Sequence, residues 1–128
     1  SFSYTLGNRK AKAKQATLKS ELRVLDYELT LAQDQLSQEF EQAYAYWQQA
    51  NEVLTLQRKN AELSVTLSQL ERQRFDAGDS DMFKLNARES GVLKAKLKAI
   101  EAQVSLLEAE LRLHRVVAGI MTSPELRG

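Results

Sequence analysis

Residues with reactive side chains are present in this 128-residue chain, but they do not form a catalytic or metal-binding pattern. His114 is the only histidine and there is no cysteine, so a metal site would lack the ligands that usually complete one. The 17 acidic residues are interspersed with 18 basic ones, as on solvated helix faces. We therefore predict no catalytic residue, no enzymatic activity, no cofactor and no metal, and we interpret His114 as an ordinary helix residue.

Aromatic residues gather in the middle of the chain, where Tyr44, Tyr46 and Trp47 lie within four positions. Such a cluster can stack on a ligand, but large aromatic side chains more often pack against neighbouring helices. We interpret this cluster as structural. The net charge of +1 gives no long-range field, so we expect no nucleic-acid partner.

The segment from Arg74 to Asp81 is the one strong break in a helix-favouring sequence. Gly78 can adopt the left-handed conformation that ends a helix, and Asp79, Ser80 and Asp81 can each cap a following helix. A stop followed so closely by a start predicts a tight helical hairpin. Its polar tip either only caps the two helices or also docks another protein. The candidate docking residues are Arg74, Asp76, Ala77, Gly78, Asp79, Ser80 and Asp81.

The elements on either side of this tip are predicted to be helices of different length. Residues 8–77 contain neither glycine nor proline and would form a helix about 105 Å long. We predict the tip at 78–80, a second helix at 81–118 and an irregular tail at 119–128. Residues 1–6 alternate polar and apolar side chains, which predicts the end of a β-strand at residues 1–7. The predicted fold is all-α: a long antiparallel helical hairpin (coiled coil) with unequal arms and a short N-terminal strand stub.

Apolar residues form two rows on each predicted helix. On the first helix, the long stripe comprises Leu18, Leu22, Leu25, Leu29, Ala32, Leu36, Phe40, Ala43, Trp47, Ala50 and Leu54, and the second stripe comprises Val53, Leu56, Leu63, Leu67 and Leu70. On the second helix, the leucine seam comprises Leu93, Leu97, Ile100, Val104, Leu107 and Leu111, and the alanine seam comprises Ala95, Ala99, Ala102, Leu106, Ala109, Leu113 and Val116. The seams of the second helix are offset by two residues, about 200° of rotation, so they lie nearly back to back. A helix with opposed apolar rows needs neighbours on both sides, and the alanine seam predicts the closer neighbour.

The second helix is too short to cover the first. Folding back from the tip, it would reach only to about Phe40, which leaves Leu18 to Leu36 without a partner inside the chain. Burial of a leucine side chain contributes about 1.5 to 3 kcal/mol, so this row predicts further helices. Because Ser1 stands inside a patterned segment, we expect the chain to be part of a longer, processed protein.

The tip sequence resembles that of a known family. Residues 71–81 (ERQRFDAGDSD), continued by LNARES at 85–90, are similar to the hairpin tips of TolC-like outer-membrane efflux proteins, closest to the heavy-metal efflux branch. Residues 6–12 resemble the passage from a barrel strand into a periplasmic helix in that family. Residues 39–44 resemble its Glu-x-x-x-Ala-Tyr pattern, and residues 109–119 its closing helix. The Arg-Phe-x-x-Gly-x-Ser-Asp run is the most specific part of the match.

The resemblance implies a trimeric channel whose β-barrel lies in the outer membrane and continues as an α-helical tunnel in the periplasm. The chain would be one tunnel repeat, with most of its barrel strands absent, and its tip would dock a periplasmic adaptor of a tripartite efflux pump. Two other interpretations are the helical hairpin of such an adaptor, which is expected to have more nearly equal arms, and a structural coiled coil.

Overall fold

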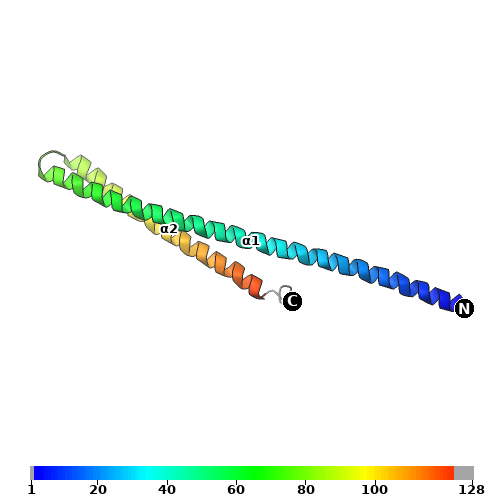
Figure 1. The fold of residues 1–128 in the computed structure, drawn as a ribbon. Helices are drawn as coiled ribbons and strands as arrows, with labels where there is room; N and C mark the ends of the chain where they lie inside the picture. Colours follow the sequence, from blue (N-terminus) through cyan, green and yellow to red (C-terminus); the bar gives the residue numbers. More distant parts are fainter. Residues whose placement is uncertain (1, 123–128) are drawn as a thin grey trace.

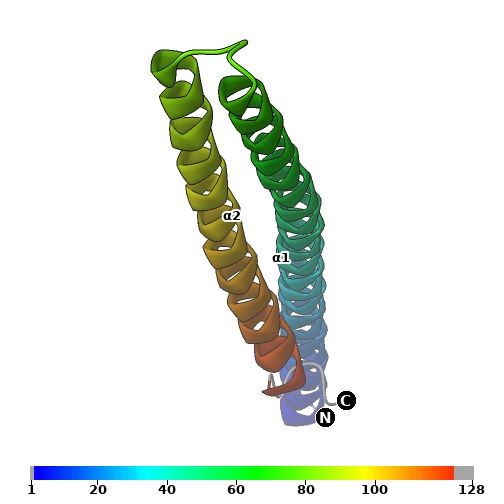
Figure 2. The ribbon, with the colours of Figure 1, turned by 90° about the vertical axis from the view of Figure 1, so that its left-hand side faces the viewer.

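The computed structural model describes residues 2–122, with side chains from Thr5 onward. It consists of two antiparallel helices, α1 (Phe2–Asp76, 75 residues) and α2 (Met82–Thr122, 41 residues), joined by a short turn (Figure 1). The predicted all-α hairpin with unequal arms is confirmed. Two views at right angles show that the whole of α2 lies beside the half of α1 that is nearer the turn (Figure 2).

The predicted N-terminal strand is wrong for residues 2–7, which belong to α1; Ser1 lies outside the described residues. Six alternating residues form a strand only where another strand accepts their hydrogen bonds, and no strand is present in residues 2–122. As the first residues of α1, they accept hydrogen bonds at their carbonyl groups within the helix and need no partner strand.

The ends of the helices also differ by a few residues from the predicted bounds. Helix α1 ends at Asp76 rather than Ala77, and α2 begins at Met82 rather than Asp81. The irregular tail was predicted from Gly119, but α2 continues through this glycine to Thr122. The rest of the predicted tail, residues 123–128, lies outside the described residues.

The two helices pack through their small side chains. Ala43, Ala50 and Leu54 of the long stripe are 0 to 8% exposed, and Ala102 and Ala109 of the alanine seam are 6% and 0% exposed. Alanine at the contact lets two helix axes approach closely, since the distance between axes follows the size of the side chains there. The prediction that the alanine seam has the closer neighbour is confirmed, and that neighbour is α1.

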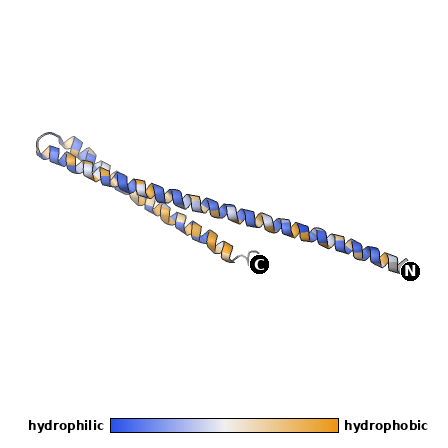
Figure 3. Cartoon of the chain, viewed as in Figure 1, coloured by the Kyte–Doolittle hydropathy of each residue, from blue (hydrophilic) through white to orange (hydrophobic). Residues whose placement is uncertain are grey.

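The larger apolar rows lie on the outside of the hairpin. Every residue of the leucine seam is 49 to 71% exposed, and every residue of the second stripe is 40 to 61% exposed. Apolar residues are accordingly visible along α2, particularly towards its C-terminal half (Figure 3). Among the described residues, no large side chain is fully buried.

The hairpin exposes far more surface than a compact protein of its size. Its accessible surface is 10437 Å², whereas a compact monomer of 14.5 kDa exposes about 6,900 Å². Part of α1 extends past the end of α2 without a neighbouring helix (Figure 1). We call this part the overhang; from the helix lengths it comprises residues 2–35. Within it, Leu18, Leu22 and Leu25 are 49%, 64% and 60% exposed.

Candidate functional site

The tip begins with a tightly closed end of α1. Gly78 has a φ of 86°, in the left-handed region. The amide of Asp79 donates to the carbonyl of Arg74 at 2.8 Å, and the amide of Gly78 donates to the carbonyl of Phe75 at 3.0 Å. These two bonds form a Schellman motif, which satisfies the last carbonyl groups of a helix. The predicted role of Gly78 is therefore confirmed.

The start of α2 is capped by a single side chain. The Oδ1 atom of Asp81 accepts a hydrogen bond of 2.8 Å from the amide of Lys84, the third residue of α2. This is the geometry of an N-cap. Of the three residues that the sequence offered for this role, the structure selects Asp81, so Asp79 and Ser80 are available for other contacts.

Ser80 and Arg74 both contact Glu71, a residue that sequence reasoning did not single out. The Ser80 hydroxyl donates to Oε1 of Glu71 at 2.8 Å, and Nη1 of Arg74 lies 3.7 Å from Oε2. Glu71 is 6% exposed and lies in the row of α1 that faces α2. A buried carboxylate needs such partners, and together they hold the turn against the end of α1.

Asp76 and Asp79 present carboxylates that are not used within the hairpin. Both residues are exposed, and in the described part of the chain neither carboxylate forms a hydrogen bond or an ion pair. Ala77 is exposed between them, and the Arg74 side chain is 61% exposed despite its contact with Glu71. The structure thus brings all seven predicted tip residues together and divides them into two groups: those that fix the turn and those that face outward.

Two large apolar residues extend this outward face. Met82 and Phe83 are the first two residues of α2, and they are 58% and 83% exposed. Leu85, which follows within the same turn of helix, is 3% exposed because it faces α1. The sequence analysis missed Met82 and Phe83, although the sequence shows two large apolar residues directly after a possible N-cap. The resulting surface combines two free carboxylates with two exposed apolar side chains.

The aromatic residues in the middle of α1 contact one another, and one of them contacts α2. The rings of Phe40 and Tyr44 stack with centroids 6.1 Å apart, and Trp47 follows at 5.8 Å from Tyr44. The guanidinium group of Arg112 in α2 lies 5.9 Å from the centroid of Tyr46, a cation–π contact between the two helices. Tyr46 therefore contributes to the contact between the two helices, whereas the rings of Phe40, Tyr44 and Trp47 contact one another within α1.

His114 is exposed on α2, and the described residues include no group of side chains that could hold a metal ion. Over residues 2–122, neither helix has an apolar stretch long enough to cross a lipid bilayer. Comparison with protein-family models, with curated proteins and with solved structures finds no match to this chain.

Proposed function

We propose that this chain is a segment of the periplasmic α-helical tunnel of a trimeric outer-membrane efflux channel. In this role the two helices form part of the conduit wall, and the tip docks a periplasmic adaptor protein. The proposal comes from the resemblance of residues 71–90 to TolC-like efflux proteins. The observation that carries it is the placement of the larger apolar rows on the outside of the hairpin.

The outward-facing rows support lateral packing against further hairpins. The leucine seam lies about 160 to 200° around α2 from the seam that contacts α1, because the two are offset by two residues. The second stripe lies one residue before the inward-facing row of α1, which is about 100° of rotation. The hairpin therefore offers a different apolar surface on each helix. Two different surfaces in contact make a heterologous interface, which closes into a ring when the rotation permits.

The second stripe of α1 and the leucine seam of α2 also lie at overlapping positions along the length of the hairpin. Leu54 and Ala102 both lie at the contact between the helices, so residues 53–70 of α1 run alongside roughly residues 87–104 of α2. The second stripe of one copy can therefore face the leucine seam of a neighbour in the same orientation. Such a contact buries leucine side chains that are otherwise about half exposed, each contributing on the order of 1 kcal/mol.

The tip is suited to docking because it is rigid and exposed at once. The Schellman motif, the Asp81 cap and the buried Glu71 fix its shape, while Asp76, Asp79 and Phe83 remain free. A preformed surface loses little conformational entropy on binding. The free carboxylates favour a partner that presents basic side chains around an apolar pocket.

A structural coiled coil is the second candidate, and one observation favours it. Residues 2–7 are helical, so the strand that would have led into a barrel no longer supports the channel. The helical hairpin of an adaptor is less well supported, because α1 and α2 differ in length by 34 residues. Binding at the tip distinguishes the channel segment from the structural coiled coil.

The test is capture of a purified periplasmic adaptor, taken from the pump whose genes adjoin the gene of this chain. The variant is Asp76→Lys with Asp79→Lys, which reverses the two free carboxylates and leaves the Asp81 cap intact. We expect at least tenfold weaker capture and unchanged helicity by circular dichroism.

The matched control is Glu101→Lys with Glu108→Lys, the same change of charge on exposed residues of α2 far from the tip. This control should bind the adaptor like the parent chain. Equal capture by all three proteins, or no capture by the parent, would show that the tip only joins two helices.

A further inference from the structure

Charged residues border the long stripe where it runs along the overhang. In heptad notation the leucines of this stretch, from Leu18 to Leu29, alternate between d and a positions. The e and g positions directly beside an a or d residue are called the flanking positions here. From residue 12 to residue 28 they are occupied by Lys12, Lys14, Lys19, Glu21, Asp26 and Glu28. The charge at the flanking positions therefore changes sign once, between Lys19 and Glu21.

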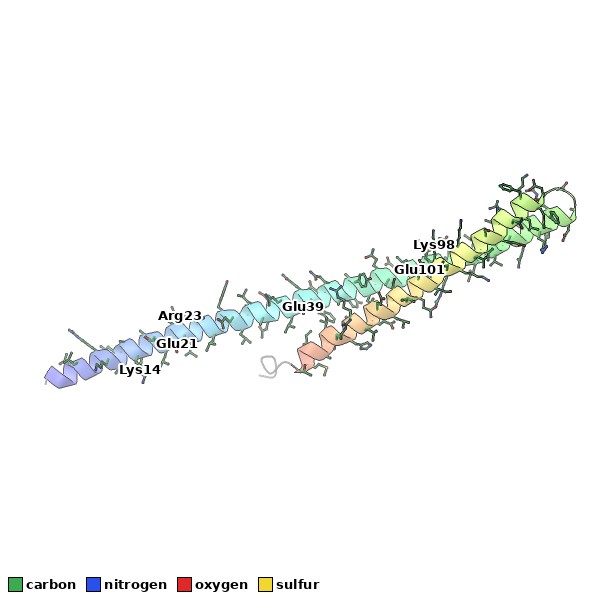
Figure 4. All side chains as sticks on the ribbon, turned by 180° about the vertical axis from the view of Figure 1, so that it is seen from behind. Lys14, Glu21, Arg23, Glu39, Lys98 and Glu101 are labelled. Carbon is green, nitrogen blue, oxygen red and sulfur yellow. The ribbon has the colours of Figure 1, made fainter. Side chains whose placement is uncertain are left out.

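The hairpin does not use these six charges. All six side chains are exposed, and in the described part of the chain none of them takes part in an ion pair. Lys14 and Glu21 stand on the stretch of α1 that α2 does not reach (Figure 4). Along the covered part of α1, from Tyr44 to Arg74, three of the ten flanking positions are charged, and all three hold arginine. Charge is thus concentrated beside the part of the long stripe that has no neighbouring helix.

The contact between α1 and α2 shows how flanking positions meet across two antiparallel helices. Arg72 and Glu89 both stand at flanking positions, and their side chains lie 4.0 Å apart. On the other side of the contact, the guanidinium group of Arg112 lies over the ring of Tyr46, again between two flanking positions. A helix that packed on the overhang in the same way would place its own flanking residues against the six charges. Charges at e and g positions determine which helices pair.

A second copy of this chain does not suit the overhang. In the same orientation, lysines would face lysines and carboxylates would face carboxylates, which is destabilising. In the reverse orientation Lys19 can lie beside Glu21, but residue 2 then lies beside residue 38, where α2 already covers α1. The two tips would also point in opposite directions, which does not suit a conduit wall. To that extent the choice of occupant rests on the proposed function, whereas the order of the charges does not.

We propose that the overhang binds a separate amphipathic helix that runs antiparallel to α1 and in line with α2. Its flanking positions are basic in the first half and acidic in the second half. The basic half then lies beside Glu21, Asp26 and Glu28, and the acidic half lies beside the three lysines. Its apolar a and d residues extend along the long stripe the contact that α2 makes nearer the tip. Residues 11–32 measure about 33 Å, so a helix of three heptads covers them.

The test supplies such a helix by fusing it after Gly128 of the full chain through a short flexible linker. The fused helix has three heptads with leucine at a and d, lysine at e and g in its first half, and glutamate at e and g in its second half. All proteins carry Leu97→Glu with Val104→Glu, which removes association through the leucine seam. The amides of residues 11–32 should exchange at least tenfold more slowly than without the fused helix, because a single exposed helix opens more readily than a paired one.

The matched control is the same fused helix with its lysine and glutamate halves exchanged. Composition and leucine row are then unchanged, but like charges face each other, so exchange should be at least tenfold faster than with the first fused helix. Reversing the charges of the overhang in the control protein should restore the slow exchange; the changes are Lys12→Glu, Lys14→Glu, Lys19→Glu, Glu21→Lys, Asp26→Lys and Glu28→Lys.

Three results would overturn the proposal. Equal protection by both fused helices would show that the order of the charges does not select the partner. Protection by neither would show that the overhang does not bind such a helix. A protein that dimerises through the overhang while the fused helix stays unprotected would show that a second copy is the occupant.

Cysteine cross-linking tests the orientation, because the chain has no cysteine of its own. The first helix is used as a free peptide with a cysteine at its last position. It should cross-link to the chain carrying Ala11→Cys and not to the chain carrying Ala32→Cys, since the two positions are about 32 Å apart. The opposite preference would indicate a parallel helix and would overturn the proposal. None of these measurements uses the tip, so their failure is distinguishable from a failure of adaptor capture.

Discussion

Gly78 and Gly91 show how one residue type has opposite effects in two conformations. Gly78 has a φ of 86°, whereas Gly91 lies within α2, and no neighbouring atom comes within 4 Å of the position where a Cβ would stand at either site. The effect of a methyl group at each site is therefore set by the backbone and not by crowding.

We predict that Gly78→Ala lowers the free energy of unfolding by about 1 to 2 kcal/mol, because L-residues are disfavoured in the left-handed region. The same change at Gly91 should raise it by about 0.5 to 1 kcal/mol, because alanine is the better helix former. Urea unfolding followed by circular dichroism, at one protein concentration, measures both. Equal signs for the two variants would contradict the assigned conformations.

The two aspartates of the tip should likewise differ. Asp81→Ala removes the hydrogen bond to the amide of Lys84 and should lower the free energy of unfolding by about 0.5 to 2 kcal/mol. Asp79→Ala removes an exposed carboxylate without a partner and should change it by less than about 0.5 kcal/mol. Thermal unfolding of the Asp81→Ala and Asp79→Ala variants checks this prediction. A larger loss for Asp79→Ala would mean that the cap had been assigned to the wrong residue.

At the scale of the helices, the packing of the hairpin depends on which apolar row of each helix faces the other helix. Ala109 of the alanine seam is 0% exposed against α1, while Ala118, also in α2, is exposed. Substitution of each by leucine adds the same atoms in two different environments.

Ala109→Leu should lower the free energy of unfolding by about 1 to 3 kcal/mol, because the larger side chain forces the helices apart. Ala118→Leu should change it by no more than about 0.5 kcal/mol. Chemical denaturation of both variants tests this. Tolerance of leucine at position 109 would show that the alanine seam is not the contact between the helices.

Much of this arrangement could be predicted from the sequence because it depends on local chemistry. The absence of glycine and proline from residues 8–77 determines a long helix, and Gly78 followed by acidic caps determines the turn. The strand was predicted wrongly at residues 2–7, because strand formation depends on a partner that the alternation itself cannot supply. Whether Asp81 or Asp79 caps α2 depends on the exact residue at which α1 ends. The burial of Glu71 depends on the register of α2. Neither is encoded in a local pattern.

For the whole molecule, the central feature is the surface that the hairpin leaves uncovered. Its 10437 Å² of accessible surface includes an apolar row on each helix and the row of the overhang. Exposed apolar surface of this extent marks sites of association. The outward rows of the two helices differ from each other, so they can build assemblies larger than a dimer.

The most direct measurement is sedimentation velocity of the chain over a wide range of concentration, compared with two variants. The parent should form species larger than a dimer as the concentration rises, and the tip variant Asp76→Lys with Asp79→Lys should behave like the parent. The seam variant Leu97→Glu with Val104→Glu should form no species larger than a dimer. A parent that stays at or below a dimer throughout, or a seam variant that assembles as the parent does, would contradict a role for the outward rows in a conduit wall.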